Sequence, residues 1–371
     1  MENFVVSARK YRPQTFASVV GQAHITTTLK NAIATGQLAQ AFLFCGPRGV
    51  GKTTCARILA KTINCTNRTA EVEACNECES CRSFNESASM NIFELDAASN
   101  NSVDDIRELV KQVYIPPQTG RYKVYIIDEV HMLSQAAFNA FLKTLEEPPA
   151  YAKFILATTE KHKIIPTILS RCQIFDFKRI GAEDIVHHLE YVAGNEGISY
   201  EPEALHLVAQ KAEGGLRDAL SIFDQMVSFT QGNLTYKGVS QNLGVLDSDY
   251  FFRFVDLMRA GDVGGVLLLY QEVIDMGFDG QHFVTGLSEH LRNLMVSIDA
   301  ATLRLLEASE AMRTRYGQQA AACGLPLLMR WLELSSDYEY RYREAGNKRL
   351  FVEVILMRLA GMVNAQMPPA G

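Results

Sequence analysis

A phosphate-binding pattern lies near the start of the chain. Residues 46–53 read GPRGVGKT, which fits G-x-x-x-x-G-K-[S/T] at every fixed position. Glycines let successive backbone N–H groups turn toward one anion, and the start of a helix adds partial positive charge there. Lys52 is expected to reach the β- and γ-phosphates of bound ATP, and the Thr53 hydroxyl to ligate Mg²⁺. A glycine-rich turn with a chance lysine is the alternative, and the flanking strand and helix patterns argue against it.

Polar residues follow two further apolar strand patterns. Residues 124–127 (VYII) run directly into Asp128 and Glu129. Asp128 is expected to hold Mg²⁺, directly or through water, and Glu129 is the natural general base for the water that attacks the γ-phosphate. Two acids that merely end a strand are the alternative. Thr158 and Thr159 follow the apolar residues of the pattern FILATTE, where a hydroxyl could sense the γ-phosphate or orient that water.

Two arginines occupy positions that need an explanation. Arg217, in GGLRDALS, lies in the first turn of a predicted helix, where a cation opposes the helix dipole unless it faces an anion such as ATP. Pairing with Asp218 or Glu213 is the alternative. Arg171, in ILSRCQIF, lies too far along the sheet for easy contact with its own chain's nucleotide. It could instead reach the ATP of a neighbouring subunit, and a plain surface arginine fits the bare sequence equally well.

Four of the eight cysteines lie close together. Cys65, Cys75, Cys78 and Cys81 form the pattern C-x9-C-x2-C-x2-C. Four thiolates suit tetrahedral Zn²⁺, and a closed set of four leaves no open position for catalysis. The segment between them is polar, so the metal is expected to supply much of its folding energy. The sequence predicts a structural zinc module at residues 65–81, with an iron–sulfur cluster as the alternative.

The elements that must position these groups fall into three parts. Over residues 1–180, short apolar strand patterns alternate with helical patterns, which is typical of a parallel α/β sheet covered on both faces. Beyond about residue 180 the strand signal ends, and amphipathic patterns predict a helical lid over 181–245 and an all-helical domain over 246–371. The tail, residues 367–371 (MPPAG), reads as a domain end with a linker to follow. The expected strands are 41–45, 92–95, 124–127, 154–157 and 173–177.

Composition limits the class of protein. A hydrophobic content of 47% with 21% charged residues is typical of a globular chain. No apolar run reaches about 18 residues, so no membrane-spanning helix and no membrane partner are expected. The N-terminus lacks the order of a secretory signal, which makes a cytoplasmic location the default. The net charge of −6 excludes a surface that is basic all over, but a local positive stripe can still bind nucleic acid.

Together these motifs resemble one family. They are KYRPQTFASVVGQ, GPRGVGKT, the four-cysteine insertion, DEVHMLSQAAFNAFLKTLEEPP, LATTE, LSRC and GGLRDALS. This set is similar to the gamma/tau subunits of the bacterial DNA polymerase III clamp loader, which are AAA+ ATPases. The resemblance is dense to about residue 245 and diffuse beyond it. The cysteine insertion differs from archaeal and eukaryotic clamp-loader small subunits, and the intact P-loop differs from the delta and delta-prime subunits.

The resemblance implies a fold and residue roles. The fold is a P-loop AAA+ domain with a zinc insertion, followed by a helical lid and an all-α collar. Asp128 and Glu129 would serve Mg²⁺ and hydrolysis, Thr158 would be the first sensor and Arg217 the second. Arg171 would act in trans on a neighbour's ATP. The residues implied to bind ATP are Gly46, Pro47, Arg48, Gly49, Val50, Gly51, Lys52, Thr53 and Thr54. Those implied to line the adenine pocket are Tyr11, Arg12, Pro13, Val19 and Val20.

The resemblance also implies partners and an activity. The partners are delta, delta-prime and further gamma/tau copies in a hetero-pentamer, the beta sliding clamp, and primer–template DNA. The expected enzyme is an ATP hydrolase within the DNA polymerase III holoenzyme, a nucleotidyltransferase complex, whose ATP cycle opens the clamp and loads it onto DNA in replication. An ATP-dependent scaffold that does not cycle is one alternative. Another AAA+ DNA-remodelling ATPase, such as a branch-migration motor, is a second.

One stretch departs from the family pattern. Asn100 and Asn101 stand in DAASNNSVDDIREL, where the family often has basic residues facing DNA. Only Arg107 is clearly cationic in that stretch. Asparagines can still bond phosphate oxygens, but they release no counterions. We therefore expect a smaller electrostatic contribution to DNA affinity, with a shallower salt dependence.

Overall fold

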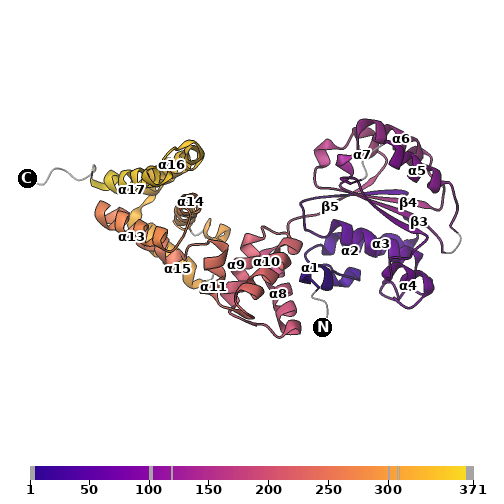
Figure 1. Ribbon diagram of the computed structural model, residues 1–371, viewed down its shortest axis with the longest axis horizontal. Coiled ribbons are helices and arrows are strands. Elements are labelled where there is room, and N and C mark those ends of the chain that lie inside the picture. Colours follow the sequence, from indigo (N-terminus) through magenta and orange to yellow (C-terminus); the bar gives the residue numbers. More distant parts are fainter. Residues whose placement is uncertain are drawn as a thin grey trace, which may run out of the picture. The chain divides into compact units, whose positions relative to one another are not determined.

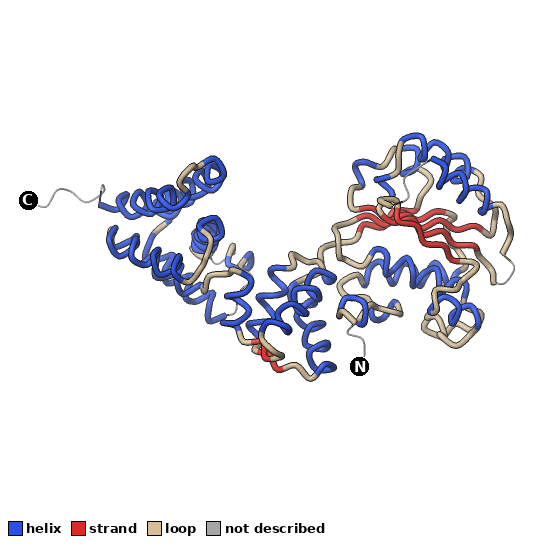
Figure 2. Tube along the Cα trace, in the orientation of Figure 1, coloured by secondary structure: helices blue, strands red, loops and turns tan. Residues whose placement is uncertain are grey.

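The computed structural model divides into two compact units, Met1–Tyr236 and Lys237–Gly371 (Figure 1). The first contains a large sheet and the second is helical (Figure 2). The three-part division at residues 180 and 245 stays a prediction. The structure describes residues 5–99, 103–117, 120–299, 301–306, 308 and 310–364.

The first unit is built on a parallel sheet, as predicted. Its strands are β1 (Ala41–Cys45), β2 (Ile92–Asp96), β3 (Lys123–Asp128), β4 (Ala152–Thr158) and β5 (Gln173–Asp176). They pair in the order β2-β3-β4-β1-β5, which leaves β2 and β5 at the edges. All five predicted strands are present, with slightly shifted ends. Since parallel strands place their carboxyl ends along one border, the residues that follow β1, β3 and β4 meet there.

Helices cover both faces of the sheet (Figure 1). The covering helices are α2 (Ala23–Thr35) and α3 (Lys52–Asn64) on one face, and α5 (Val103–Val113), α6 (Gln135–Glu146) and α7 (Pro166–Leu169) on the other. Phe42 and Phe44 pack with α2 and α3, whereas Leu43 packs with the opposite group. This alternation follows from the two-residue period of a strand, and it explains why β1 is apolar throughout.

The first unit also contains several smaller elements. They are α1 (Ser7–Lys10), α4 (Glu79–Asn85), and the 3-10 helices η1 (Phe16–Ser18), η2 (Val130–Met132) and η3 (Lys161–Lys163). α4 belongs to the cysteine segment, for which the sequence predicted no helix. This helix buries only a small apolar surface, from Cys81 and Phe84.

The segment after the sheet is helical, with one correction. Its helices are α8 (Ala182–Glu196), α9 (Pro202–Lys211) and α10 (Leu216–Phe229), close to the predicted spans. β6 (Ser199–Tyr200), between α8 and α9, and β7 (Asn233–Leu234), after α10, form a short parallel pair, so the expectation that strands end near residue 180 was wrong. Two-residue strands are too short to produce a recognisable alternation of apolar and polar residues.

The second unit is helical throughout its described residues. Its helices are α12 (Ser248–Ala260), α13 (Val263–Asp275), α14 (Gly280–Val296), α15 (Glu310–Cys323), α16 (Leu325–Arg341) and α17 (Lys348–Asn364), with η4 (Leu303–Leu305) and η5 (Tyr342–Glu344); α11 (Tyr236–Leu243) begins at the boundary. Trp331 is fully buried in its core and donates from Nε1 to the Leu359 carbonyl at 2.9 Å. Among the helices that the structure describes, none is long and apolar enough to cross a membrane.

Phe154 gives a test of the sheet core. The ring is fully buried in β4, with centroids 5.6 Å from Tyr125 and 5.2 Å from Phe141. We expect Phe154→Ala to lower the free energy of unfolding by about 3–5 kcal/mol, because it removes apolar contact and leaves a cavity. Chemical denaturation of the first unit measures this. Phe229→Ala, at a side chain that is 57% exposed, is the control and should change it by less than about 1 kcal/mol.

Candidate nucleotide site and metal centre

The loop between β1 and α3 has a backbone that its glycines make possible. Gly46 has φ 148°, Gly49 has φ 77° and Gly51 has φ 100°. A Cβ at Gly46 would lie 2.4 Å from the carbonyl oxygen of Phe177, so a larger residue would push the loop away from the end of β5. The Gly46 N–H donates to the Thr158 carbonyl at 3.2 Å, which ties the loop to β4 as well. The loop is thus held at its start by both neighbouring strands.

Lys52, the first residue of α3, is folded back against this loop. Its Nζ donates to the carbonyl oxygens of Gly46 at 2.8 Å and Pro47 at 2.7 Å. The residue is only 6% exposed. Burial lowers the pKa of Lys52, and the carboxylates of Glu129 and Asp128 act in the opposite direction. The ammonium is therefore positioned at the loop by two carbonyls, with two carboxylates near enough to favour its charge.

The two residues predicted to hold Mg²⁺ meet directly. The Thr53 hydroxyl donates to Oδ2 of Asp128 at 2.5 Å, which joins the start of α3 to the end of β3. A hydroxyl and a carboxylate are ligands that Mg²⁺ accepts, with water and phosphate oxygens in its other positions. The donor set fits the ion that the sequence predicts.

Glu129 has a strained backbone and a fixed side chain. Its φ of 46° is unusual for a residue other than glycine, and such strain persists only where the surroundings enforce it. Its Oε2 accepts from the Thr159 hydroxyl at 3.0 Å and from the Thr159 N–H at 3.3 Å. The sequence suggested Thr158 or Thr159 as the partner of an attacking water. It did not predict that Thr159 would hold the carboxylate itself.

His131 lies between the acidic pair, Asp128 and Glu129, and the threonine pair, Thr158 and Thr159. Its Nδ1 lies 3.0 Å from the Thr158 hydroxyl and 3.4 Å from Oε2 of Glu129. Thr158 is fully buried, and its hydroxyl also accepts from the Glu160 N–H at 3.0 Å. The sequence motifs assigned no chemical role to His131. The short spacing in DEVH was the signal that could have placed it beside Glu129.

Arg217 lies next to the loop through its backbone. It is the second residue of α10, and its N–H donates to the Gly49 carbonyl at 3.3 Å. Among the described residues, its exposed guanidinium forms no hydrogen bond or ion pair, and Glu213 pairs with Arg179 instead, at 3.4 Å. The alternative pairing with Asp218 or Glu213 is therefore absent from the described residues. Its role as a sensor stays a prediction.

Arg171 is paired within its own chain. It follows α7, and its Nη2 donates to Oε1 of Glu146 at 2.6 Å while Nη1 donates to the Thr167 carbonyl at 2.6 Å. Its hydrogen bonds to described residues include none to the loop or to the acidic pair. That Arg171 acts on the nucleotide of a neighbour, and not on that of its own chain, stays a prediction.

The N-terminal segment implied to line the adenine pocket bonds to two elements. Nε of Arg12 donates to the Thr54 hydroxyl in α3 at 3.2 Å. The Tyr11 hydroxyl donates to Glu196 in α8, and burial together with that contact raises the pKa of Tyr11 to about 12. Val19 packs against the sheet core.

Four further residues were predicted to face adenine or DNA. Pro13 and Val20 are half-buried, and the adenine pocket stays a prediction. Asn100 and Asn101 lie outside the described residues.

An open cleft borders the loop. It encloses about 620 Å³ and is lined by Gly46, Pro47, Thr159, Lys161 and Asp176, among others. Nζ of Lys161 donates to both carboxylate oxygens of Asp176, at 2.9 and 3.0 Å. Gly46 and Pro47, at the start of the loop, and Thr159, which bonds to Glu129, therefore line the same cleft.

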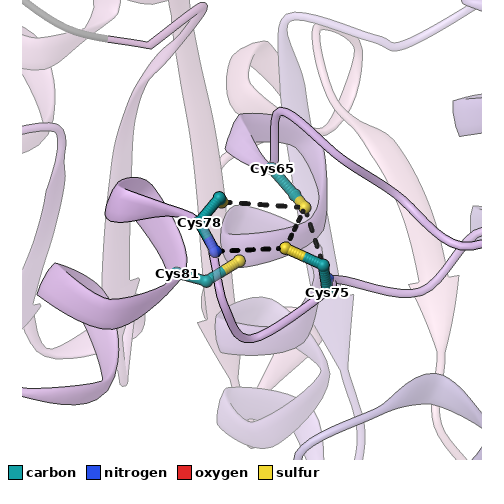
Figure 3. Close-up of side chains that lie close together, drawn as sticks. All are labelled: Cys65, Cys75, Cys78 and Cys81. Carbon is teal, nitrogen blue, oxygen red and sulfur yellow. Dashed lines mark hydrogen bonds between the residues drawn. The ribbon is translucent and has the colours of Figure 1, made fainter.

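The four clustered cysteines converge as predicted (Figure 3). Their sulfur atoms all lie within 4.8 Å of one another, with Sγ of Cys65 3.5 Å from that of Cys75 and 4.0 Å from that of Cys78. Zinc bound to sulfur at about 2.3 Å in a tetrahedron spaces its ligands about 3.8 Å apart. Cys65, Cys75, Cys78 and Cys81 therefore fit a zinc site.

Backbone donors surround these sulfurs. The N–H groups of Cys75 and Cys78 donate to Sγ of Cys65 and Cys75, each at 3.3 Å. Burial alone would raise the pKa of Cys78, but hydrogen bonds from Thr66 and Cys81 outweigh it and lower that pKa to about 6. The buried core of this segment consists of Cys65, Ala74 and Cys81. So small a core is compatible with a segment that a bound metal stabilises, which stays a prediction.

Three family models match the chain in succession. The model described as "DNA polymerase III, delta subunit" matches residues 21–181. "DNA polymerase III clamp loader subunit, ATPase lid domain" matches residues 184–232. "DNA polymerase III subunits gamma and tau domain III" matches residues 234–370.

Curated relatives agree with these models. DNA polymerase III subunit tau of Escherichia coli (strain K12) is 44% identical over 84% of this chain and 49% of its own length. DNA polymerase III subunit gamma of Buchnera aphidicola (subsp. Baizongia pistaciae) is 37% identical over 86% of each chain. The chain spans about half the length of the tau subunits it matches. Among solved structures, the Holliday junction branch migration motor RuvB of Thermotoga maritima is 19% identical, with a TM-score of 0.48 over 67% of this chain and 79% of its own.

Lys52→Ala tests the loop. We expect it to weaken ATP binding about 10- to 100-fold, because it removes charge-assisted bonds to phosphate. Isothermal titration of the purified chain with Mg–ATP measures the effect. Lys143→Ala, an exposed lysine of α6, is the control and should bind as the wild type does. Equal affinity in both variants would contradict the assignment.

Metal analysis tests the cysteine cluster. The purified chain should contain about one zinc per molecule, and Cys78→Ser should lose it, because a tetrahedral site then lacks a ligand. Cys172→Ser, outside the cluster, should keep the metal. Iron accompanied by visible absorbance would instead establish an iron–sulfur cluster.

Proposed function

Because the chain belongs to the gamma/tau family of DNA polymerase III clamp-loader subunits, which are AAA+ ATPases, we propose that its ATP cycle drives the loading of a sliding clamp onto primer–template DNA. It would act in the cytoplasm, in a hetero-pentamer with delta, delta-prime and further copies of itself. The observation that carries the proposal is the bond between Thr53 and Asp128, with Lys52 and Glu129 beside it. A glycine loop, a Mg²⁺-type ligand pair and a base are thus assembled in one chain.

Each group has a defined task in this proposal. Lys52 and the loop N–H groups bind the phosphates, and Thr53 with Asp128 holds Mg²⁺. The ion would neutralise charge on the β- and γ-phosphates. Glu129 accepts the proton of the attacking water. Thr159 occupies its Oε2, and no described residue donates a hydrogen bond to Oε1, which leaves that oxygen available to the water.

Arg171 would complete the site of a neighbouring copy. Its pair with Glu146 lies at the surface, with side chains 33% and 48% exposed. Surface pairs of this kind contribute about 0–1 kcal/mol, so a phosphate that develops charge can compete for the guanidinium. In this proposal, assembly and DNA contact align Arg171, and hydrolysis then releases the closed clamp. The clamp-loading step is the function of the whole assembly.

The rival functions fit less well. A scaffold that binds ATP without hydrolysis needs no general base, yet Glu129 is held in a strained conformation beside Asp128. A branch-migration motor fits less well, because the family models that match residues 184–232 and 234–370 describe clamp-loader ATPase lid and gamma/tau domains. The proposal assigns only ATP hydrolysis to this chain. The nucleotidyltransferase activity of the holoenzyme is not attributed to it.

Arg171→Ala tests the proposed neighbour contact. In the reassembled clamp loader we expect ATP affinity to be unchanged and the DNA-stimulated turnover to fall about 10³-fold or more, since trans arginines act mainly in the transition state. Steady-state ATPase assays with clamp and primed DNA measure this. Glu146→Ala is the matched control, because it removes the same ion pair but leaves the arginine. Full turnover with Arg171→Ala would exclude the trans role.

A further inference from the structure

One buried carboxylate of the cysteine segment contacts a distant part of the chain. Glu73 is 6% exposed, and its Oε2 and Oε1 accept from the N–H groups of Phe16 at 2.9 Å and Ala17 at 3.0 Å. Nζ of Lys30 in α2 lies 2.7 Å from Oε1. Charge-assisted bonds to a buried carboxylate are among the stronger contacts in a protein. Glu73 therefore fixes the backbone at η1.

The cysteine segment is shaped to present this carboxylate. Glu73 and Thr69 exchange bonds, since Thr69 N–H donates to the Glu73 carbonyl at 3.0 Å and the Glu73 N–H to the Thr69 hydroxyl at 3.1 Å. Val72 has φ 62°, which is rare for a β-branched residue and persists only where surrounding contacts enforce it. Cys75, a predicted zinc ligand, lies two residues after Glu73.

The segment that Glu73 fixes runs beside the phosphate loop. On one side of η1, Arg12 donates to Thr54 in α3 at 3.2 Å. On the other, the Gln22 amide donates to the Lys178 carbonyl at 2.7 Å and to the Val50 carbonyl at 3.5 Å. Residues 11–22 thus bond to the phosphate loop or its helix on both sides of η1. A ribose and base that extend from the loop would meet this segment.

The cysteine segment also contacts the helix that carries Lys52. Lys61 of α3, only 2% exposed, donates from Nζ to Oδ1 of Asn76 at 2.7 Å. A small cavity of about 10 Å³ is lined by Arg12 and Gln14 from the N-terminal segment and by Lys61 and Phe84 from α3 and α4. The cysteine segment therefore touches both structures that border the nucleotide site.

We propose that the four-cysteine module positions residues 11–22 for nucleotide through Glu73, so that metal loading and ATP affinity are coupled. The inference rests on the ATP binding proposed above. The metal fixes the chain around Cys75, the fixed chain holds Glu73, and Glu73 holds η1. Without that contact, residues 11–22 are ordered for a smaller fraction of the time, and apparent affinity falls by that fraction.

Glu73→Ala in the full chain tests the proposal. We expect ATP to bind about tenfold more weakly, as if residues 11–22 were ordered about a tenth of the time. Binding of inorganic tripolyphosphate, which has no ribose or base, should be unchanged. Zinc content should stay at about one per chain. Glu71→Ala removes an exposed acid of the same segment, and this control should match the wild type in all three measurements.

A second variant and a metal titration separate positioning from general damage. Glu73→Gln keeps an acceptor and the side-chain shape, so its loss of ATP affinity should be smaller. Reversible removal of zinc should weaken ATP binding in the wild type and have little further effect in Glu73→Ala, because both changes act through one contact.

Three outcomes are decisive. Unchanged ATP affinity in Glu73→Ala would overturn the inference, as would an equal loss of tripolyphosphate binding. Wild-type protein that binds no ATP would instead overturn the proposed function.

Discussion

The bond between Thr53 and Asp128 joins the two halves of the nucleotide site. Thr53 is the second residue of α3 and Asp128 ends β3, and β4 lies between β1 and β3 in the sheet. The bond therefore depends on the strand order, on a parallel arrangement that brings carboxyl ends to one border, and on the tight loop that turns β1 into α3. The buried strands supply the rigid frame. They hold the Thr53 hydroxyl within hydrogen-bond distance of the Asp128 carboxylate.

Around the Thr53–Asp128 bond, further polar side chains are held by hydrogen bonds to their neighbours. Lys52 is held by loop carbonyls, Glu129 by Thr159, and Thr158 lies against His131. Lys52, Glu129 and Thr158 are thus each held by a neighbouring group. Such support matters because a catalytic group must lie close to its productive geometry before substrate arrives. The strain at Glu129 is a local cost of this arrangement.

Much of the fold and of the candidate site could be predicted, because the sequence patterns that indicate them are local. The phosphate loop and the four cysteines are short motifs, and the central strands β1, β3 and β4 are largely apolar because both faces of the sheet are covered. What the sequence did not indicate depends on contacts between distant residues. Glu73 lies in a polar stretch that reads as exposed, yet it bonds to Phe16, 57 residues away. The pair β6–β7 was missed because each strand has two residues. The contact of Thr159 with Glu129 needed the strand order to be known.

The two outer strands of the sheet have a consequence for how copies of this chain can associate. An outer strand offers unpaired backbone groups, which invite another molecule to extend the sheet. β5 is only four residues long and exposes Gln173 and Asp176, while β2 carries Glu94 and Asp96. Short outer strands that carry charged side chains are poor templates for sheet-to-sheet pairing between like molecules. We therefore expect copies of this chain to associate through surfaces other than the two outer strands.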